Sequence, residues 1–243
     1  MRRGPRRCAS LGDMGDMIVG ILGGTGPAGK ALAARLASVG LDVRIGSRQQ
    51  GRAEEVAGEL RSKWQGRDLL LSGLENEAAC EADLVVLATP WDGAGPLARS
   101  LARHLEGRTV VSMVNALAKV GDELQALIPP SGSITLAVQQ AAPGARVAGA
   151  FHHLPARVLA DLDRSLDADV LVCSDHPSAT AAAIDLADRI PGCRGVDAGS
   201  FSAAAAVEAF TAVLIGINIK HKAHSSIKLT GFHPPARDAS TPT

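Results

Sequence analysis

The sequence predicts a doubly wound α/β fold, in which helices cover both faces of a parallel sheet. Two observations carry this prediction. From Met17 to Val114, short apolar runs alternate with segments of helical periodicity, as in consecutive βαβ units. The first of these runs also ends in a glycine-rich turn that leads directly into a helix. The chain has 243 residues, of which 46% are hydrophobic, which is enough for one large domain and its core.

The apolar runs predict the strands, and the segments with apolar residues every three to four positions predict the helices. The expected strands are 17–23, 42–47, 68–73, 82–89, 108–114, 146–152, 168–174 and 193–199. The expected helices are 27–40, 52–64, 77–80, about 94–105, 178–190 and a long alanine-rich helix over 202–226.

The chain is expected to divide into a Rossmann-like domain, residues 17–199, and a small, mainly helical C-terminal subdomain, residues 200–232. The late helix is apolar on most faces, so we expect it to be buried over the ligand edge of the sheet or at a subunit interface. Residues 1–16 are basic and broken by Gly and Pro, and residues 233–243 are rich in Pro, Ser and Thr. Both segments are predicted to be disordered. No apolar segment typical of a signal peptide precedes the first strand.

The composition excludes several classes of function. Lys and Arg together number 25, as do Asp and Glu, and aromatic residues make up only 2%. This balance argues against nucleic-acid and membrane partners, and no run of about 18 apolar residues predicts a membrane span. The four cysteines are far apart and form no CxxC pair, which favours reduced thiols in the cytoplasm over disulfides or a zinc site. No bound metal is expected.

The glycine-rich turn fits the pattern GxGxxG and lies between a predicted strand and a predicted helix, a context that indicates a dinucleotide site. Residues without side chains let the backbone approach a pyrophosphate, which then rests on the free N–H groups of the helix N-terminus. A glycine-rich turn without a ligand is the alternative interpretation. The residues expected to bind the cofactor here are Gly24, Thr25, Gly26, Pro27, Ala28 and Gly29.

The end of the second strand indicates which dinucleotide binds. A site for NAD carries Asp or Glu here, whose carboxylate accepts a hydrogen bond from the ribose 2′-hydroxyl. This strand ends in Ser47 and Arg48 instead, and Arg52 follows one helical turn later. A hydroxyl and a guanidinium bind a 2′-phosphate, which a carboxylate would repel. The sequence therefore predicts NADP(H), unless these arginines are only solvated surface charges.

The remaining strand ends should surround the nicotinamide, because the carboxyl ends of the strands line the ligand crevice. Candidate residues there are Thr89, Pro90, Trp91, Met113, His152, His153, Leu154 and Pro155. His152 is the tentative catalytic residue, as a proton donor or a ligand contact, and a purely structural histidine is the alternative. Neighbours on a strand point to opposite faces, which argues against His152 and His153 sharing a metal ion.

No residue pattern diagnostic of a general acid is present. Hydride transfer between two redox rings mainly needs alignment of the rings, which fits this observation. A basic cluster near the chain end, Lys220, His221, Lys222 and His224, is interpreted as a solvated face or as a contact for an anionic substrate tail.

The motifs together resemble those of NADPH-dependent reductases of coenzyme F420, the F420H2:NADP oxidoreductases. The resemblance rests on GILGGTGPAGKALAARLASVG, IGSR, ATPWDGA, HHLPAR and DAG, in this order, and spans about Met17 to Gly231. It implies a Rossmann domain with a small C-terminal domain, a homodimer, and reversible hydride transfer between nicotinamide C4 and deazaflavin C5.

The resemblance also implies roles for particular residues. The 2′-phosphate site of the family matches Ser47, Arg48 and Arg52, and Thr25 falls in its pyrophosphate loop. The deazaflavin pocket matches residues 152–155 together with residues near the chain end. A proton joins the deazaflavin ring on reduction, and His152 is the candidate that assists it.

Two alternative functions remain open at this stage. The first is an NADP-dependent imine, pyrroline-carboxylate or hydroxyacid reductase. The Lys–xxx–Asn pair of the hydroxyacid enzymes is absent, because neither Lys220 nor Lys222 is followed by Asn four residues later. The second is a non-catalytic protein that senses NADP.

Overall fold

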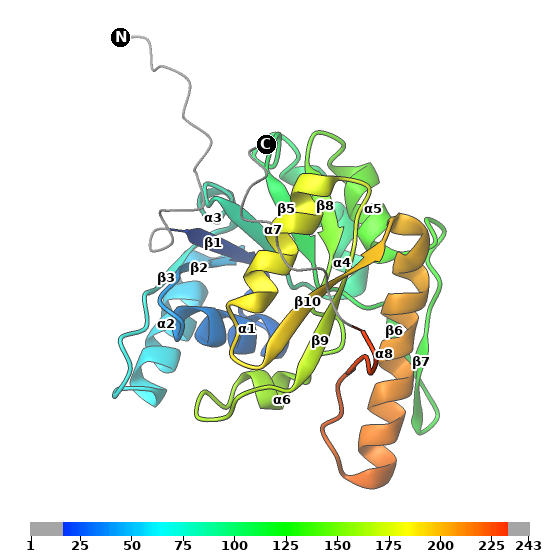
Figure 1. Cartoon of the computed structure of the whole chain (residues 1–243). Coiled ribbons are helices and arrows are strands. Elements are labelled where there is room, and N and C mark those ends of the chain that lie inside the picture. The colour runs from blue at the N-terminus through cyan, green and yellow to red at the C-terminus, as the bar shows by residue number, and fades with distance from the viewer. Residues whose placement is uncertain (1–16, 233–243) are drawn as a thin grey trace, which may run out of the picture.

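An eight-stranded sheet with helices on both faces organises the computed structural model, which describes residues 17–232 (Figure 1). The two segments expected to be disordered, 1–16 and 233–243, lie outside the described residues. The strand order is β10-β9-β8-β5-β4-β1-β2-β3. The strands are β1 (Ile18–Leu22), β2 (Asp42–Ser47), β3 (Leu71–Glu75), β4 (Leu84–Leu87), β5 (Thr109–Ser112), β8 (Arg146–Gly149), β9 (Ala168–Cys173) and β10 (Cys193–Gly199).

The predicted doubly wound fold is confirmed, with one difference in strand direction. Strands β1 to β5 and β8 run parallel. Strand β9 pairs with β8 in antiparallel orientation, and β10 runs parallel to β9. A parallel connection usually needs a long crossover helix, and the segment between β8 and β9 contains only the four-residue helix α6 (Ala156–Leu159). The chain therefore enters β9 at the edge of the sheet where β8 ends.

Two hydrophobic cores lie on the two faces of the sheet. On one face α1 (Pro27–Ala37), α2 (Gln50–Lys63), α6 and α7 (Pro177–Asp188) pack against the sheet. On the other face lie α3 (Asn76–Ala79), α4 (Trp91–Ser100) and α5 (Ile134–Ala141). Helix α1 forms where the sequence predicts it, because Pro27 suits its first turn and its apolar residues recur at helical spacing.

Several elements differ from the predicted ones. Helix α4 begins at Trp91 rather than near Ala94, with Asp92 in its first turn, where an acidic side chain stabilises the helix dipole. The hairpin of β6 (Leu117–Val120) and β7 (Glu123–Ala126) and the helix α5 have no predicted counterpart. Strand β8 ends at Gly149, three residues earlier than expected.

The last helix, α8 (Phe201–His221), stands beside the β6–β7 hairpin and contacts α5 (Figure 1). One face of this helix is not buried within the chain, because Phe210, Val213 and Ile217 are 40–50% exposed. The alternative expectation, burial at a subunit interface, stays a prediction. By length and mean hydropathy alone, 1.7 over its most apolar window, α8 could cross a membrane, but core helices can meet the same test. The division between residues 17–199 and 200–232 stays a prediction.

The chain after α8 returns to β9, where the buried carboxylate of Asp169 holds it. Arg194 of β10 donates to Asp169 from Nε and Nη2, at 2.8 and 2.6 Å, and the backbone N–H of Leu229 donates at 2.6 Å. The N–H of Asp169 donates in turn to the carbonyl of Ile227. Burial alone raises the pKa of Asp169, but these hydrogen bonds outweigh it, so the pKa lies below its ordinary value of 3.8.

We predict that Asp169→Asn lowers the free energy of unfolding by about 2 kcal/mol at pH 7, because the charge facing Arg194 is lost. The folded-state pKa of Asp169 is depressed, so its contribution is complete above about pH 4 and fades as the pH falls further. Urea unfolding of both proteins at several pH values between about 7 and 3 measures the difference. A difference that stays constant down to pH 3 would contradict the ionised pair.

Candidate functional site

The glycine-rich turn joins β1 to α1 and brings backbone N–H groups to the sheet edge. The N–H of Gly26 donates to the carbonyl of Gly23 at 3.2 Å, and α1 begins at Pro27. A Cβ atom on Gly29 would lie 2.7 Å from the Cα of Gly24, so the first turn of the helix rests directly on the loop. This is the close backbone approach that a pyrophosphate cradle requires.

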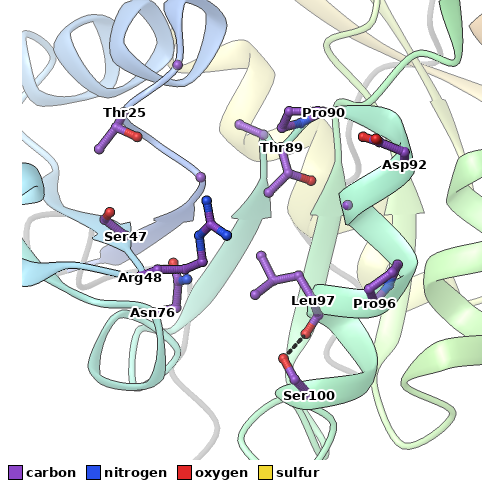
Figure 2. A pocket seen from close by; sticks show the side chains of 14 residues that line it. Thr25, Ser47, Arg48, Asn76, Thr89, Pro90, Asp92, Pro96, Leu97 and Ser100 are labelled. Carbon is purple, nitrogen blue, oxygen red and sulfur yellow. Dashed lines mark hydrogen bonds between the residues drawn. The ribbon is translucent and has the colours of Figure 1, made fainter.

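A first cavity of about 760 Å³ opens beside this turn, between the ends of β1, β2 and β4 and helix α4 (Figure 2). This volume is in the range of sites for small molecules and cofactors. Figure 2 shows Ser47 and Arg48 on one side of the opening and Thr89, Pro90 and α4 on the other. Of the predicted cofactor-binding residues, those that line it are Thr25, Gly26, Ser47, Arg48, Thr89 and Pro90.

The polar groups of the first cavity are suited to a phosphorylated ligand. Ser47 Oγ accepts a hydrogen bond from the N–H of Gln49 at 3.3 Å, which leaves its O–H free to donate. Arg48 is exposed and forms no ion pair within residues 17–232. Thr89 Oγ1 and Asn76 Oδ1 are buried and have no hydrogen-bond partner among the described residues. Sequence reasoning did not identify Asn76.

Gly24, Pro27 and Gly29 of the glycine-rich turn line neither cavity, and two further predicted residues also lie away from the lining. The Arg52 guanidinium is 46% exposed and pairs with Glu55 on the next turn of α2. Trp91 is 39% exposed at the start of α4 and lines neither this cavity nor the second one described below. Their assignment to the cofactor stays a prediction.

A second cavity of about 250 Å³ lies on the other side of the first turn of α1, at the ends of β5 and β8. Helix α8 contributes Thr211, Leu214 and Asn218 to its wall, and Ser225 comes from the returning C-terminal segment. The predicted residues that line it are Ala28, Met113, His152, His153, Leu154 and Pro155.

His152 and His153 lie in a turn rather than on a strand, because β8 ends at Gly149 and Phe151 adopts a φ of +64°. The expectation that they point to opposite faces of a strand is therefore wrong. Both side chains are buried, and their ring centroids are 6.3 Å apart. The described residues contain no group of three His, Cys, Asp or Glu side chains that could hold a metal ion.

The two imidazoles are held differently. Nε2 of His153 lies 2.6 Å from the carbonyl oxygen of Val207, which accepts its hydrogen bond. The Nδ1 atom of His152 is buried without a partner among the described residues. Burial, followed by the neighbouring His153, lowers the pKa of His152 to about 3. Burial also lowers the pKa of His153, against the effect of its hydrogen bond. Both rings are thus neutral at physiological pH.

A buried carboxylate fixes the wall behind the second cavity. Glu208 of α8 accepts hydrogen bonds from the N–H groups of Ile134 and Thr135 at 2.7 and 2.9 Å, and from Thr135 Oγ1 at 2.7 Å. It therefore satisfies the free N–H groups at the start of α5 and ties that helix to α8. Burial raises the pKa of Glu208, and these hydrogen bonds act in the opposite direction.

Comparison with known proteins finds relatives among the F420-dependent NADP reductases. The family model described as "NADP oxidoreductase coenzyme F420-dependent" matches residues 18–116. The F420-dependent NADP reductase of Methanocaldococcus jannaschii is 39% identical over 222 residues, which cover 89% of this chain and 99% of the relative. The F420-dependent NADP reductase of Methanothermobacter marburgensis is 33% identical over 225 residues, with the same coverage of both chains.

The fold is also similar to that of a solved structure from Arthrobacter sp. FB24, described as a candidate F420-dependent NADP reductase. The TM-score is 0.71 at 23% identity, and the match covers 88% of this chain and 97% of the other. At this identity the likeness supports the fold alone.

We predict that the His152 ring stays neutral between about pH 8 and pH 5, because burial lowers its pKa to about 3. Imidazole NMR shifts across this range measure its protonation, and the His152→Asn variant assigns its signals. A titration midpoint near 6.5, the ordinary value for histidine, would contradict the buried neutral ring.

Proposed function

The chain belongs to the coenzyme F420-dependent NADP oxidoreductase family, and from this premise we propose that it transfers hydride reversibly between NADP(H) and coenzyme F420. The observation that carries the proposal is the relative from Methanocaldococcus jannaschii, which matches along 99% of its own length. The two cavities fit two ring-bearing substrates. Thr25 and Gly26 line the first cavity, and Ala28, two residues later, lines the second, so the cavities meet at the first turn of α1.

The first cavity is the proposed site of NADP(H). The glycine-rich turn and the start of α1 bind the pyrophosphate through backbone N–H groups. The O–H of Ser47 and the guanidinium of Arg48, both without an acceptor among residues 17–232, bind the 2′-phosphate. Thr89 and Pro90 line the first cavity on the side where the nicotinamide end of the cofactor is proposed to lie.

The second cavity is the proposed site of the deazaflavin. When bound, NADPH supplies the hydride and oxidised F420 supplies the ring that accepts it. The apolar wall of Met113, Leu154 and Leu214 excludes water and aligns the ring. His152 is neutral, so we propose that it contacts the ligand by a hydrogen bond from an uncharged imidazole rather than as an imidazolium acid.

A spectroscopic assay with purified protein, NADPH and oxidised F420 tests this function. We expect rapid loss of the deazaflavin absorbance and fluorescence with NADPH, and little with NADH or with FMN in place of F420. Tight binding of NADPH without bleaching of F420 would contradict the proposed acceptor and would favour an imine reductase or a sensor of NADP.

We predict that Arg48→Ala weakens NADPH binding by about 1.5–3 kcal/mol, the range for a hydrogen bond to a charged group, and leaves NADH binding nearly unchanged. Arg52→Ala should have a smaller effect, because the Arg52 guanidinium already pairs with Glu55. Dissociation constants for both cofactors, measured by fluorescence titration, test both statements. An equal loss for NADPH and NADH in Arg48→Ala would contradict the 2′-phosphate assignment.

We further propose a cytoplasmic homodimer that associates through α8. Phe210, Val213 and Ile217 recur at helical spacing and form an exposed apolar face on this helix. We place the protein in the cytoplasm because the described cysteines, Cys80, Cys173 and Cys193, are free thiols.

We predict that Ile217→Lys converts the dimer into a monomer, because a charge would then be buried in the apolar interface. Light scattering coupled to gel filtration measures the mass of each protein. Lys222→Ala, on the exposed residue that follows the end of α8, is the matched control and should remain dimeric. A monomeric wild-type protein at about 50 µM would contradict the proposal, since the Kd values of stable dimers lie far below this concentration.

A further inference from the structure

Asn76 lines the first cavity, and its side chain has no role in the cofactor site as described so far. It is the first residue of α3 and follows directly on Glu75, the residue of β3 that pairs with Ser47 of β2. Asn76 therefore lies level with Arg48, at the edge of the sheet where β2 ends. It lines the first cavity and is only 4% exposed. In Figure 2 its carboxamide points toward the same opening as Arg48.

The side chain of Asn76 is unsatisfied in the described part of the chain. Its Oδ1 atom is buried without a hydrogen-bond partner, and its amide nitrogen donates to no described residue. A buried carbonyl oxygen without a partner is unfavourable for folding, and native proteins keep few of them. Such a group therefore points to a partner that binds later.

The neighbouring backbone makes room for the carboxamide. A Cβ atom on Gly46 would lie 2.9 Å from Asn76 Oδ1, closer than side chains approach in real structures. Gly46 immediately precedes Ser47 and Arg48, the two residues proposed to bind the 2′-phosphate. The same strand therefore lacks a side chain where it faces Asn76. The amide is thus held beside these two residues by the packing of β2 against α3.

The chemistry of this position matches a phosphorylated ribose. In a site for NAD, a carboxylate at the end of β2 accepts a hydrogen bond from the ribose 2′-hydroxyl, next to the 3′-hydroxyl. Here Ser47 and Arg48 are donors suited to the 2′-phosphate, which leaves the 3′-hydroxyl without an acceptor. A carboxamide offers both functions, because its N–H groups can donate to a phosphate oxygen and its carbonyl can accept a hydroxyl.

We propose that Asn76 is a specificity-determining residue that hydrogen-bonds the 2′-phosphoribose of NADP(H). The inference rests on the proposed function, because it assigns this residue to the same cofactor site. It predicts that the carboxamide stabilises the bound cofactor and contributes little to the folded protein alone.

Two variants and two ligand fragments test the proposal without requiring turnover. Titration calorimetry measures the binding of 2′,5′-ADP, which carries the 2′-phosphate, and of 5′-AMP, which lacks it. We expect Asn76→Ala to weaken 2′,5′-ADP about 10-fold, as for the loss of a hydrogen bond to a charged group. We expect Asn76→Asp, which has nearly the same shape, to weaken 2′,5′-ADP more strongly through repulsion and to bind 5′-AMP at least as well as the wild type does.

Thermal unfolding distinguishes this role from a structural one. Because the carboxamide has no partner in the described protein, Asn76→Ala should unfold within a few degrees of the wild type. Ser100→Ala is the matched control, since Ser100 lines the same cavity but its hydroxyl already donates to the carbonyl of Leu97 at 2.9 Å (Figure 2). This control should bind 2′,5′-ADP as the wild type does.

The same titrations separate failure of this inference from failure of the proposed function. If the wild type binds 2′,5′-ADP and Arg48→Ala weakens it, but both Asn76 variants bind within two-fold of the wild type, the role of Asn76 is overturned and the NADP site stands. If the wild type binds 2′,5′-ADP no better than 5′-AMP, both proposals are overturned.

Discussion

The relative position of the two cavities depends on one buried guanidinium. Arg35 of α1 is 2% exposed and donates to the carbonyl oxygens of Val158, Leu159 and Arg164 at 3.0, 3.1 and 2.9 Å. Burial lowers its pKa, and the carbonyl dipoles compensate the charge in place of a carboxylate. Helix α1 begins in the glycine-rich turn, and residues 158–164 follow the wall of the second cavity. This cluster of hydrogen bonds therefore fixes the cradle relative to the second cavity.

The second cavity also depends on the reversal of direction between β8 and β9. Because β9 begins at the edge where β8 ends, Asp169 lies near that edge and holds the chain that returns from α8. Asn218 Oδ1 accepts the N–H of Ser225 at 2.6 Å, which bends the returning chain into the cavity wall. Three segments far apart in sequence, residues 151–156, 211–218 and 225, therefore form one wall.

The first cavity could be predicted from the sequence because its determinants are local. The turn at residues 24–29 follows a strand pattern directly, and Ser47 and Arg48 end the next strand. The β6–β7 hairpin could not be predicted, since its strands are only four residues long and none of their residues is fully buried. Nor could Glu208, whose partners at the start of α5 are 73 and 74 residues away. Asn76 could not be predicted either, because its burial depends on packing against Gly46, and no local sequence pattern indicates that contact.

The difference between local and long-range determinants explains why the sequence indicated the nicotinamide cofactor more directly than the second redox ring. A 2′-phosphate is recognised by charge, and charged residues at a strand end can be identified in a sequence. A redox ring is recognised by shape and by the exclusion of water, which long-range packing creates. The neutral imidazoles of His152 and His153 fit that requirement, because an ionised group in so small an apolar cavity would hold water or a counter-ion. The same burial that keeps these rings uncharged therefore makes the second cavity suitable for hydride transfer between two rings.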